Sequence, residues 1–192
     1  MNLLSWNCRG LGGLRTVHEV TKMVTKYKPQ VIFLIETKRK SHEMEWLRSR
    51  WKFDRCFSVD GIGRGGGLAM LWMEDAQVVI QSYSKYHIDV SLGQIGNGTA
   101  WRLTGFYGDP ETIKRRDSWQ MLRKLKNNSQ LPWMCIGDLN EILSDSEKLE
   151  GALRPQTQMS EFRKVLEDCE LTEISSVGGK FTWTRGKVPM LS

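Results

Sequence analysis

The stretch "CIGDLNEIL", from Cys135 to Leu143, changes character in its middle. It starts with apolar residues that fit a buried strand and then breaks into Gly137, Asp138 and Asn140. An acid and an amide two residues apart are poor core residues, because burying them costs free energy unless they are paired. Their place at the end of a predicted strand indicates either a turn or a site that uses their oxygen atoms.

Three other predicted strands end on polar side chains. The run "NLLSWN" ends at Asn7, "VIFLIE" ends at Glu36, and "LTGFYG" ends at Tyr107. Hard cations such as Mg²⁺ bind carboxylate and amide oxygens and keep several waters, and Asn7, Glu36, Asp138 and Asn140 supply that ligand set. For any one of these residues alone, a simple strand-end turn is the favoured interpretation. The coincidence of four such strand ends favours a metal site at one rim of a sheet.

Hydrophobic periodicity predicts a mixed α/β chain. Several strands follow one another through hairpins and helices fall between the others, which indicates sheets covered by outer helices rather than a doubly wound sheet. Without an internal repeat or a linker, the prediction is a single domain over residues 1–192. The predicted strands are 2–7, 31–36, 53–59, 77–83, 87–92, 99–108, 131–138, one ending at Trp72 and one within 178–186; the predicted helices are 14–28, 41–51, 111–126 and 159–169.

The chain is basic. It has 28 Lys and Arg against 22 Asp and Glu, a formal net charge of +6 and a pI of about 9.2. Such a surplus favours polyanionic partners such as nucleic acid, although many basic domains bind none. The hydrophobic fraction of 40% and the charged fraction of 26% are those of an ordinary globular protein.

Cysteine usage and apolar runs bear on location. The four cysteines stand far apart without a C-x-x-C spacing, which argues against a disulfide framework and favours a reducing intracellular compartment. Cys56, Cys135 and Cys169 have apolar neighbours and are interpreted as buried thiols. No segment has the apolar length of a signal peptide or a transmembrane helix, so no membrane association is expected. A nuclear location is the expectation, although no basic cluster is dense enough for a clear nuclear signal.

Six stretches together carry a family resemblance. "LLSWNCRGL", "VIFLIETK", "GGLAMLW", "LTGFYGDP", "CIGDLNEIL" and "FTWT" occur in the order seen in the endonuclease/exonuclease/phosphatase superfamily, which has the DNase-I-like fold. The amino-acid sequence of these stretches is most similar to that of the endonuclease domain of plant LINE-type (non-LTR) retroelements. The resemblance covers nearly the whole chain. It implies a two-sheet α/β sandwich with outer helices, a Mg²⁺ cofactor that Mn²⁺ can replace, and DNA nicking. In full-length relatives it also implies fusion to a reverse transcriptase.

Carried over residue by residue, the resemblance implies five roles around a scissile phosphate. Glu36 would be the main carboxylate ligand of Mg²⁺, with Asn7 beside it. Asp138 would orient or activate the attacking water. Asn140 would hold a phosphate oxygen, and Tyr107 would touch the scissile phosphate.

Further residues are candidates for nucleic-acid contact. Thr182 and Trp183 match the late "TW" segment, which lies near the substrate groove in relatives. Lys38 belongs to a basic run next to Glu36 that could contact phosphates, with a solvated charge run as the alternative. Arg64 could meet a phosphate from a glycine-rich loop, with a simple hairpin turn as the alternative. Arg9 is a departure, because many active relatives carry a smaller residue there.

A second departure concerns catalysis. Relatives end with an Asp-His pair on a late strand, whereas His18, His42 and His87 all precede the "FTWT" segment. We therefore expect a C-terminally incomplete domain that lacks the last strands and is, as an isolated polypeptide, a weak or inactive nuclease. The alternatives are a non-catalytic nucleic-acid-binding remnant and a small-substrate phosphatase of the same fold. The oligomeric state stays open.

Overall fold

The computed structural model describes residues 1–63, 65–94, 96, 98–148 and 151–175. The chain divides into two compact units, Met1–Asn140 and Glu141–Ser192. All described candidate site residues lie in the first unit. That the whole chain is one domain stays a prediction.

The first unit opens with a four-stranded sheet in the order β1-β2-β4-β3. Its strands are β1 (Leu3–Asn7), β2 (Val31–Ile35), β3 (Arg55–Val59) and β4 (Leu68–Trp72). β1 and β2 are parallel, and β4 is antiparallel to both of its neighbours. Asn7 lies opposite Ile35, and Leu68 lies opposite both Ile35 and Val59. The last residues of β1, β2 and β3 therefore lie at the same end of this sheet.

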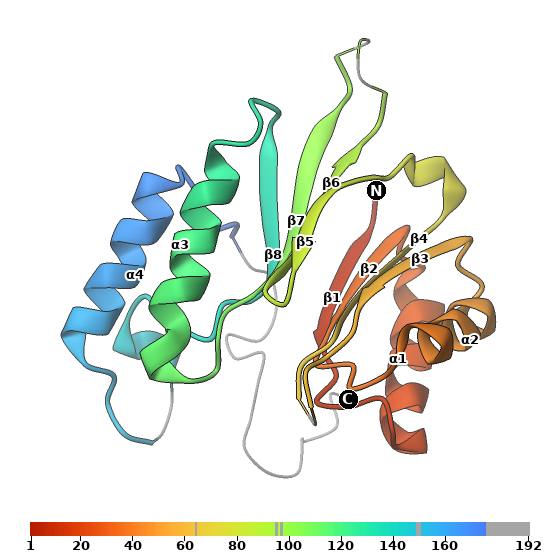
Figure 1. Cartoon of the computed structure of the whole chain (residues 1–192), viewed down its shortest axis with the longest axis horizontal. Coiled ribbons are helices and arrows are strands. Elements are labelled where there is room, and N and C mark those ends of the chain that lie inside the picture. Colours follow the sequence, from red (N-terminus) through yellow and green to blue (C-terminus); the bar gives the residue numbers. More distant parts are fainter. Residues whose placement is uncertain (64, 95, 97, 149–150, 176–192) are drawn as a thin grey trace. The chain divides into compact units, whose positions relative to one another are not determined.

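Helices α1 (Leu14–Tyr27) and α2 (Ser41–Trp51) cover the outer face of the first sheet (Figure 1). β2 is buried on both faces, as its continuous apolar run predicts. Ile32 and Leu34 pack against the two helices, whereas Val31, Phe33 and Ile35 point to the opposite side and pack against the second sheet. This alternation follows from the two-residue period of a strand.

The second sheet has the order β5-β6-β7-β8. Its strands are β5 (Val79–Ser84), β6 (His87–Leu92), β7 (Trp101–Tyr107) and β8 (Trp133–Asp138). β5, β6 and β7 are antiparallel, whereas β7 and β8 are parallel, with Tyr107 opposite Asp138. The connection from β7 to β8 carries the short 3₁₀ helix η2 (Thr112–Lys114) and helix α3 (Arg115–Lys126). Ile88 and Val90 of β6 join the core shared with the first sheet, so the predicted two-sheet sandwich with outer helices is confirmed.

The second unit is described only in part. It contains the 3₁₀ helix η3 (Asp145–Glu147) and helix α4 (Gln156–Asp168). Met159, Phe162 and Val165 form the buried stripe of α4. The first unit also contains a short 3₁₀ helix, η1 (Glu74–Ala76), which follows β4.

The predicted elements agree with the structure apart from their ends. The strand expected over 31–36 stops at Ile35, because Glu36 adopts a left-handed φ of 52°. The helix expected from residue 111 begins as η2 and becomes α-helical at Arg115, and the helix expected from 159 already begins at Gln156. The strand expected within 178–186 lies outside the described residues.

All four cysteines are free, but their burial differs in part from the prediction. Cys169 is buried as expected, whereas Cys56 and Cys135 are only half-buried. They lie in β3 and β8, each of which is the last strand on one side of its sheet. Cys8 is buried, and burial raises the pKa of its thiol to about 12. In the part of the chain that the structure describes, no helix combines the length and apolarity needed to cross a bilayer.

Candidate active site

Side chains from four strand ends meet at one rim of the sandwich. The Asn7 Nδ2 donates to Glu36 Oε1 and to Asp138 Oδ2, at 3.0 Å in each case. The Tyr107 hydroxyl donates to the same Glu36 oxygen at 3.1 Å. Residues 131 positions apart in the chain thus contact one another, because the ends of β1 and β2 face the ends of β7 and β8.

The backbone at this rim is strained. Arg9, Glu36, Lys38 and Asn140 all have positive φ, between 50° and 54°, and make up four of the eight described non-glycine residues with this feature. Such conformations cost about 1–3 kcal/mol each and concentrate at functional sites. Their gathering around one cluster is therefore an observation in favour of a site rather than of ordinary turns.

A glycine-rich loop holds the strained segment after β2. The Thr37 and Lys38 N–H groups donate to the carbonyl oxygens of Gly67 and Gly66, each at 3.1 Å. Gly67 has a φ of 88°, and a Cβ there would lie 2.5 Å from Thr37 Oγ1. Only glycine fits this close approach, which fixes the direction in which Glu36 leaves the strand.

The turn after β8 is tied to the end of β7. Asp138 Oδ1 accepts the Asn140 N–H at 3.0 Å, and Asn140 Nδ2 donates to the Gly108 carbonyl at 2.7 Å. The Gly108 N–H donates to the Asp138 carbonyl at 2.8 Å. The acid and the amide of "GDLN" therefore form a defined turn whose carboxylate still reaches Asn7.

The electrostatics of the cluster favour a cation. Glu36 Oε1 and Asp138 Oδ2 share one amide nitrogen, so these two oxygens lie at most about 6 Å apart. The Lys38 ammonium lies 3.8 Å from Glu36 Oε2 and is 39% exposed, so this pair neutralises the Glu36 charge only weakly. Burial and the Glu36 charge raise the pKa of the Tyr107 phenol above its usual value, which keeps it protonated as a donor at neutral pH.

The donor set fits a hard divalent ion. Glu36 and Asp138 offer carboxylate oxygens, and Mg²⁺ typically takes one or two carboxylates together with waters and substrate phosphate oxygens. Within the described residues no group of three or more His, Cys, Asp and Glu gathers, so a closed, all-protein cage is not formed there. Asn7 Oδ1 accepts the Arg9 N–H at 3.1 Å, so the direct ligand role of Asn7 stays a prediction.

The remaining predicted residues divide into two groups. Arg9 and Lys38 lie at the cluster, through the Arg9 N–H and the Lys38 ammonium. Arg64, Thr182 and Trp183 lie outside the described residues. Their predicted nucleic-acid contacts stay predictions.

The histidines of the described part do not hydrogen-bond to the cluster. His18 and His42 are exposed on α1 and α2. His87 is buried in β6, where its ring nitrogens face Ser82 Oγ at 3.0 Å and Ser84 Oγ at 2.8 Å. None of these three imidazole rings is therefore held by a hydrogen bond at the cluster, where it could transfer a proton.

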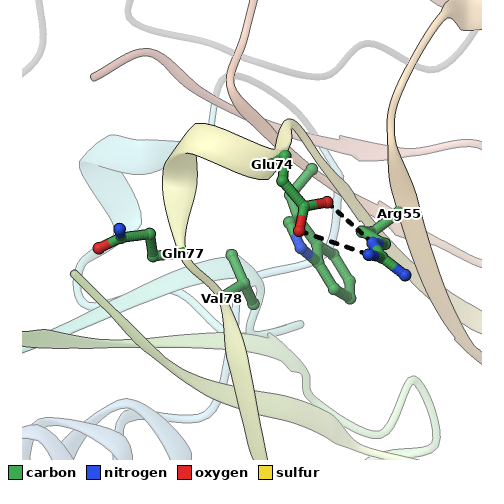
Figure 2. A pocket seen from close by; sticks show the side chains of 5 residues that line it. Arg55, Glu74, Gln77 and Val78 are labelled. Atoms are coloured by element: carbon green, nitrogen blue, oxygen red, sulfur yellow. Dashed lines mark hydrogen bonds and ion pairs between the residues drawn. The ribbon is translucent and has the colours of Figure 1, made fainter. Parts of the chain in front are cut away.

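A second feature is a hollow of about 470 Å³ at the opposite end of the first sheet, where β3 begins and β4 ends. It is lined by Arg55, Trp72, Glu74, Gln77 and Val78. Arg55 Nε lies 2.8 Å from Glu74 Oε2. Figure 2 shows this ion pair among the side chains that line the hollow. Because this ion pair is exposed and its carboxylate is already matched by a cation, the hollow offers little chemistry compared with the strand-end cluster.

Sequence reasoning missed two residues that support the cluster from behind. Tyr86 accepts the Tyr107 N–H with its carbonyl oxygen at 2.7 Å. Its hydroxyl donates to Asp109 Oδ2 at 3.0 Å. The available signal is the acid in "YGDP", Asp109, which stands two residues after the strand end at Tyr107.

Solved structures show that this architecture is shared. The chain is similar to a 3′-5′ exonuclease from Neisseria meningitidis, with a TM-score of 0.66 and 14% identity over 88% of this chain and 71% of that one. It is similar to the 3′ phosphatase NExo from Neisseria bound to a product DNA hairpin, with a TM-score of 0.62 and 13% identity over 86% and 70%. It is also similar to the endonuclease domain of TRAS1, a telomere-specific non-LTR retrotransposon, with a TM-score of 0.61 and 14% identity over 87% and 71%. At these identities the likeness shows the DNase-I-like fold.

The sequence itself supplies the family. A search of curated proteins finds no match to the chain. The sequence profile of the Endonuclease/Exonuclease/phosphatase family, in contrast, matches residues 4–185. That range includes both sheets except for Leu3, and every side chain of the strand-end cluster, and the chain therefore belongs to the endonuclease/exonuclease/phosphatase family.

Proposed function

We propose that this chain is a divalent-metal-dependent phosphodiester hydrolase that nicks DNA, of the retroelement endonuclease type. The observation that carries the proposal is the Asn7 amide bridging the Glu36 and Asp138 carboxylates at 3.0 Å. Two carboxylates held this close, with the partly exposed Lys38 ammonium 3.8 Å from Glu36, supply the oxygen ligands that Mg²⁺ prefers. The net charge of +6 favours a polyanionic substrate.

The proposed chemistry assigns one task to each side chain. A divalent ion bound at Glu36 would neutralise charge on the phosphate and its leaving oxygen. Asp138 orients the attacking water, and its second oxygen keeps it in place by accepting the Asn140 N–H. Asn140 Nδ2 carries two hydrogens, and the one not donated to Gly108 is directed to a phosphate oxygen. The protonated Tyr107 hydroxyl donates to the scissile phosphate once the substrate displaces it from Glu36.

The proposed DNA substrate rests on the rim and on the relatives. The Lys38 ammonium places positive charge at the cluster, and the Arg9 backbone N–H is bound to Asn7 there. Contacts of such basic residues with phosphates position a nucleic acid without reading its sequence. Among the similar structures, one is bound to a DNA product and another is a retrotransposon endonuclease domain. Mn²⁺ is expected to substitute for Mg²⁺, and a nuclear location with fusion to a reverse transcriptase completes the retroelement proposal.

A plasmid-nicking assay tests the proposal. Supercoiled DNA is incubated with the purified chain and Mg²⁺, with and without a chelator. We expect metal-dependent conversion to open circles, and a strong loss of rate for Asp138→Asn with its fold intact. The matched control is Asp75→Asn, an exposed carboxylate of η1, which should nick at the wild-type rate. If Asp138→Asn instead unfolds the chain, Asp138 is a structural turn residue.

A second candidate is a non-catalytic nucleic-acid-binding domain. The observation that favours it is that none of the described histidines hydrogen-bonds to a side chain of the cluster. Retained DNA binding without nicking would support this candidate. Hydrolysis of inositol or sugar phosphates with no action on DNA would instead point to a small-substrate phosphatase.

A further inference from the structure

A buried hydrogen-bonded pair lies behind the cluster and takes no direct part in it. Tyr86, in the turn between β5 and β6, is 8% exposed, and Asp109, two residues after the end of β7, is 7% exposed. The Tyr86 hydroxyl donates to Asp109 Oδ2 at 3.0 Å. A buried carboxylate requires such partners, because an unpaired one is costly.

The pair holds both ends of the three-residue segment 107–109. At one end, the Tyr107 N–H donates to the Tyr86 carbonyl at 2.7 Å. At the other end, the Tyr86 hydroxyl holds the Asp109 side chain, whose second oxygen accepts the Glu111 N–H at 3.0 Å. The Asp109 N–H donates to Ser118 Oγ at 3.3 Å, which ties the segment to α3.

The middle of this segment contacts the turn that carries Asp138. The Gly108 carbonyl accepts Asn140 Nδ2 at 2.7 Å, and the Gly108 N–H donates to the Asp138 carbonyl at 2.8 Å. A Cβ at Gly108 would collide with the Leu139 carbonyl oxygen, so the two segments are in close backbone contact. A displacement of segment 107–109 would therefore move the Tyr107 hydroxyl and the Asn140 amide together.

We propose that Tyr86 and Asp109 are positioning residues for the hydrolysis. They keep the Tyr107 hydroxyl and the Asn140 amide in place relative to Asp138, at the end of β8, and to Glu36, which follows β2. The inference rests on the proposed function, since it assigns these residues a role in the same reaction. It also predicts a structural change that can be measured without any activity.

The first test removes one hydroxyl. In Tyr86→Phe the aromatic ring stays, but the buried Asp109 oxygen loses its donor, so segment 107–109 shifts. We expect kcat for DNA nicking to fall at least tenfold and KM for DNA to stay within twofold, because misplaced catalytic groups lower transition-state binding more than substrate binding. The matched control is Tyr83→Phe, an exposed tyrosine of the same hairpin, which should keep wild-type kinetics.

A double variant separates positioning from loss of stability. If Tyr86 acts through the cluster, the loss of rate in Tyr86→Phe combined with Tyr107→Phe is smaller than the product of the two single losses. Independent effects would multiply, and that result would overturn the inference. Asp109→Asn, which keeps an oxygen acceptor for the Glu111 N–H, should reproduce the kinetic pattern of Tyr86→Phe and serves in its place if that variant does not fold.

Amide hydrogen exchange tests whether Tyr86 and Asp109 hold segment 107–109 in place, even if the chain cleaves no DNA. In Tyr86→Phe the Tyr107, Gly108 and Asp109 amides should exchange at least tenfold faster, while Val90 and Leu103 in the strand cores stay at the wild-type rate. Faster exchange with an inactive wild type would reject the proposed function but support the role of Tyr86 and Asp109 in holding segment 107–109. Unchanged exchange at all three amides would overturn that role, whatever the activity.

Discussion

Two polar clusters in the first unit both contain carboxylates, and they are built in opposite ways. On the outer face of the second sheet, Asp89 accepts Arg102 Nε at 2.8 and 3.0 Å, and both side chains are 2% exposed. At the strand-end cluster, Glu36 is 21% exposed and shares the Asn7 amide with a second carboxylate. The first cluster matches each charge within the protein, whereas the second leaves negative charge that a cation can still match.

The backbone separates the two clusters as well. Asp89, Arg102 and Thr104 occupy regular antiparallel positions of β6 and β7. Thr104 Oγ1 adds a hydrogen bond to Asp89 and accepts one from Trp133 Nε1 at 2.8 Å, which satisfies the network further. The strand-end cluster instead sits on left-handed residues such as Glu36. A matched charge on regular backbone indicates stability, and an unmatched charge on strained backbone indicates function.

The largest expected effect comes from Glu36→Gln. The neutral amide keeps the shape of the side chain and removes the anionic ligand, so DNA nicking should fall by at least about 10²–10³-fold. Folding should be unaffected or slightly improved, because the repulsion between Glu36 and Asp138 is relieved. Nicking rates and thermal unfolding measure the two outcomes.

The matched control for this variant is Glu74→Gln. Glu74 is also paired with a cation, Arg55, but at the hollow at the opposite end of the first sheet (Figure 2). It should nick DNA at the wild-type rate. Equal losses in both variants would mean that the strand-end carboxylate has no special role.

The second effect tests the buried cluster. Arg102→Met removes the cation and leaves Asp89 as an unpaired buried charge, which should lower the free energy of unfolding by about 3–5 kcal/mol. Activity per folded molecule should be retained, because neither residue contacts the strand-end cluster. Denaturant unfolding measures the loss, and Arg102→Met with Asp89→Leu should recover most of it. A stable single variant with lost activity would reverse the assignment of the two clusters.

The sequence predicted the outline of both the fold and the site. Continuous apolar runs such as 31–35 and helical spacing such as Val17 and Val20 are local signals, and the structure follows them. Asn7, Glu36 and Asp138 could be proposed because each is a polar residue that ends an apolar run. Their convergence follows from the parallel pairing of β1 with β2 and of β7 with β8, which is a finding of the structure and not a prediction from the sequence.

The support behind the site could not be predicted in the same way. Asp89 and Arg102 pair across two strands, and Tyr86 and Asp109 pair 23 positions apart, so neither contact leaves a local pattern in the chain. Glu36 reads as the last residue of a strand, because nothing local shows that its φ is 52°. Such features depend on register and loop geometry, which a single sequence specifies only through the whole fold.

A third, smaller effect concerns metal binding itself. Mg²⁺ at 100 times its dissociation constant should stabilise the wild type by about 2.7 kcal/mol, because it binds the folded state. Thermal unfolding with and without Mg²⁺ measures this without any substrate. Glu36→Gln should lose the stabilisation and Glu74→Gln should keep it. Equal stabilisation of both variants would place the ion elsewhere.

The smallest effect is a pH dependence of stability from His87, next to the buried cluster. Burial lowers the pKa of this histidine below its ordinary value of 6.5, with the Asp89 charge opposing and the Arg102 charge assisting the shift. As the pH falls below 6.5, the unfolded chain therefore takes up a proton before the folded chain does. Stability contributed by the neutral ring is complete above pH 6.5 and is lost as the pH falls toward the folded-state pKa.

This dependence can be isolated with His87→Gln. The difference in melting temperature between pH 8 and pH 5.5 should be smaller in that variant than in the wild type, because the glutamine does not titrate. His18→Gln, at an exposed position of α1, is the control and should keep the wild-type difference. An unchanged difference in His87→Gln would show that other groups cause the acid sensitivity.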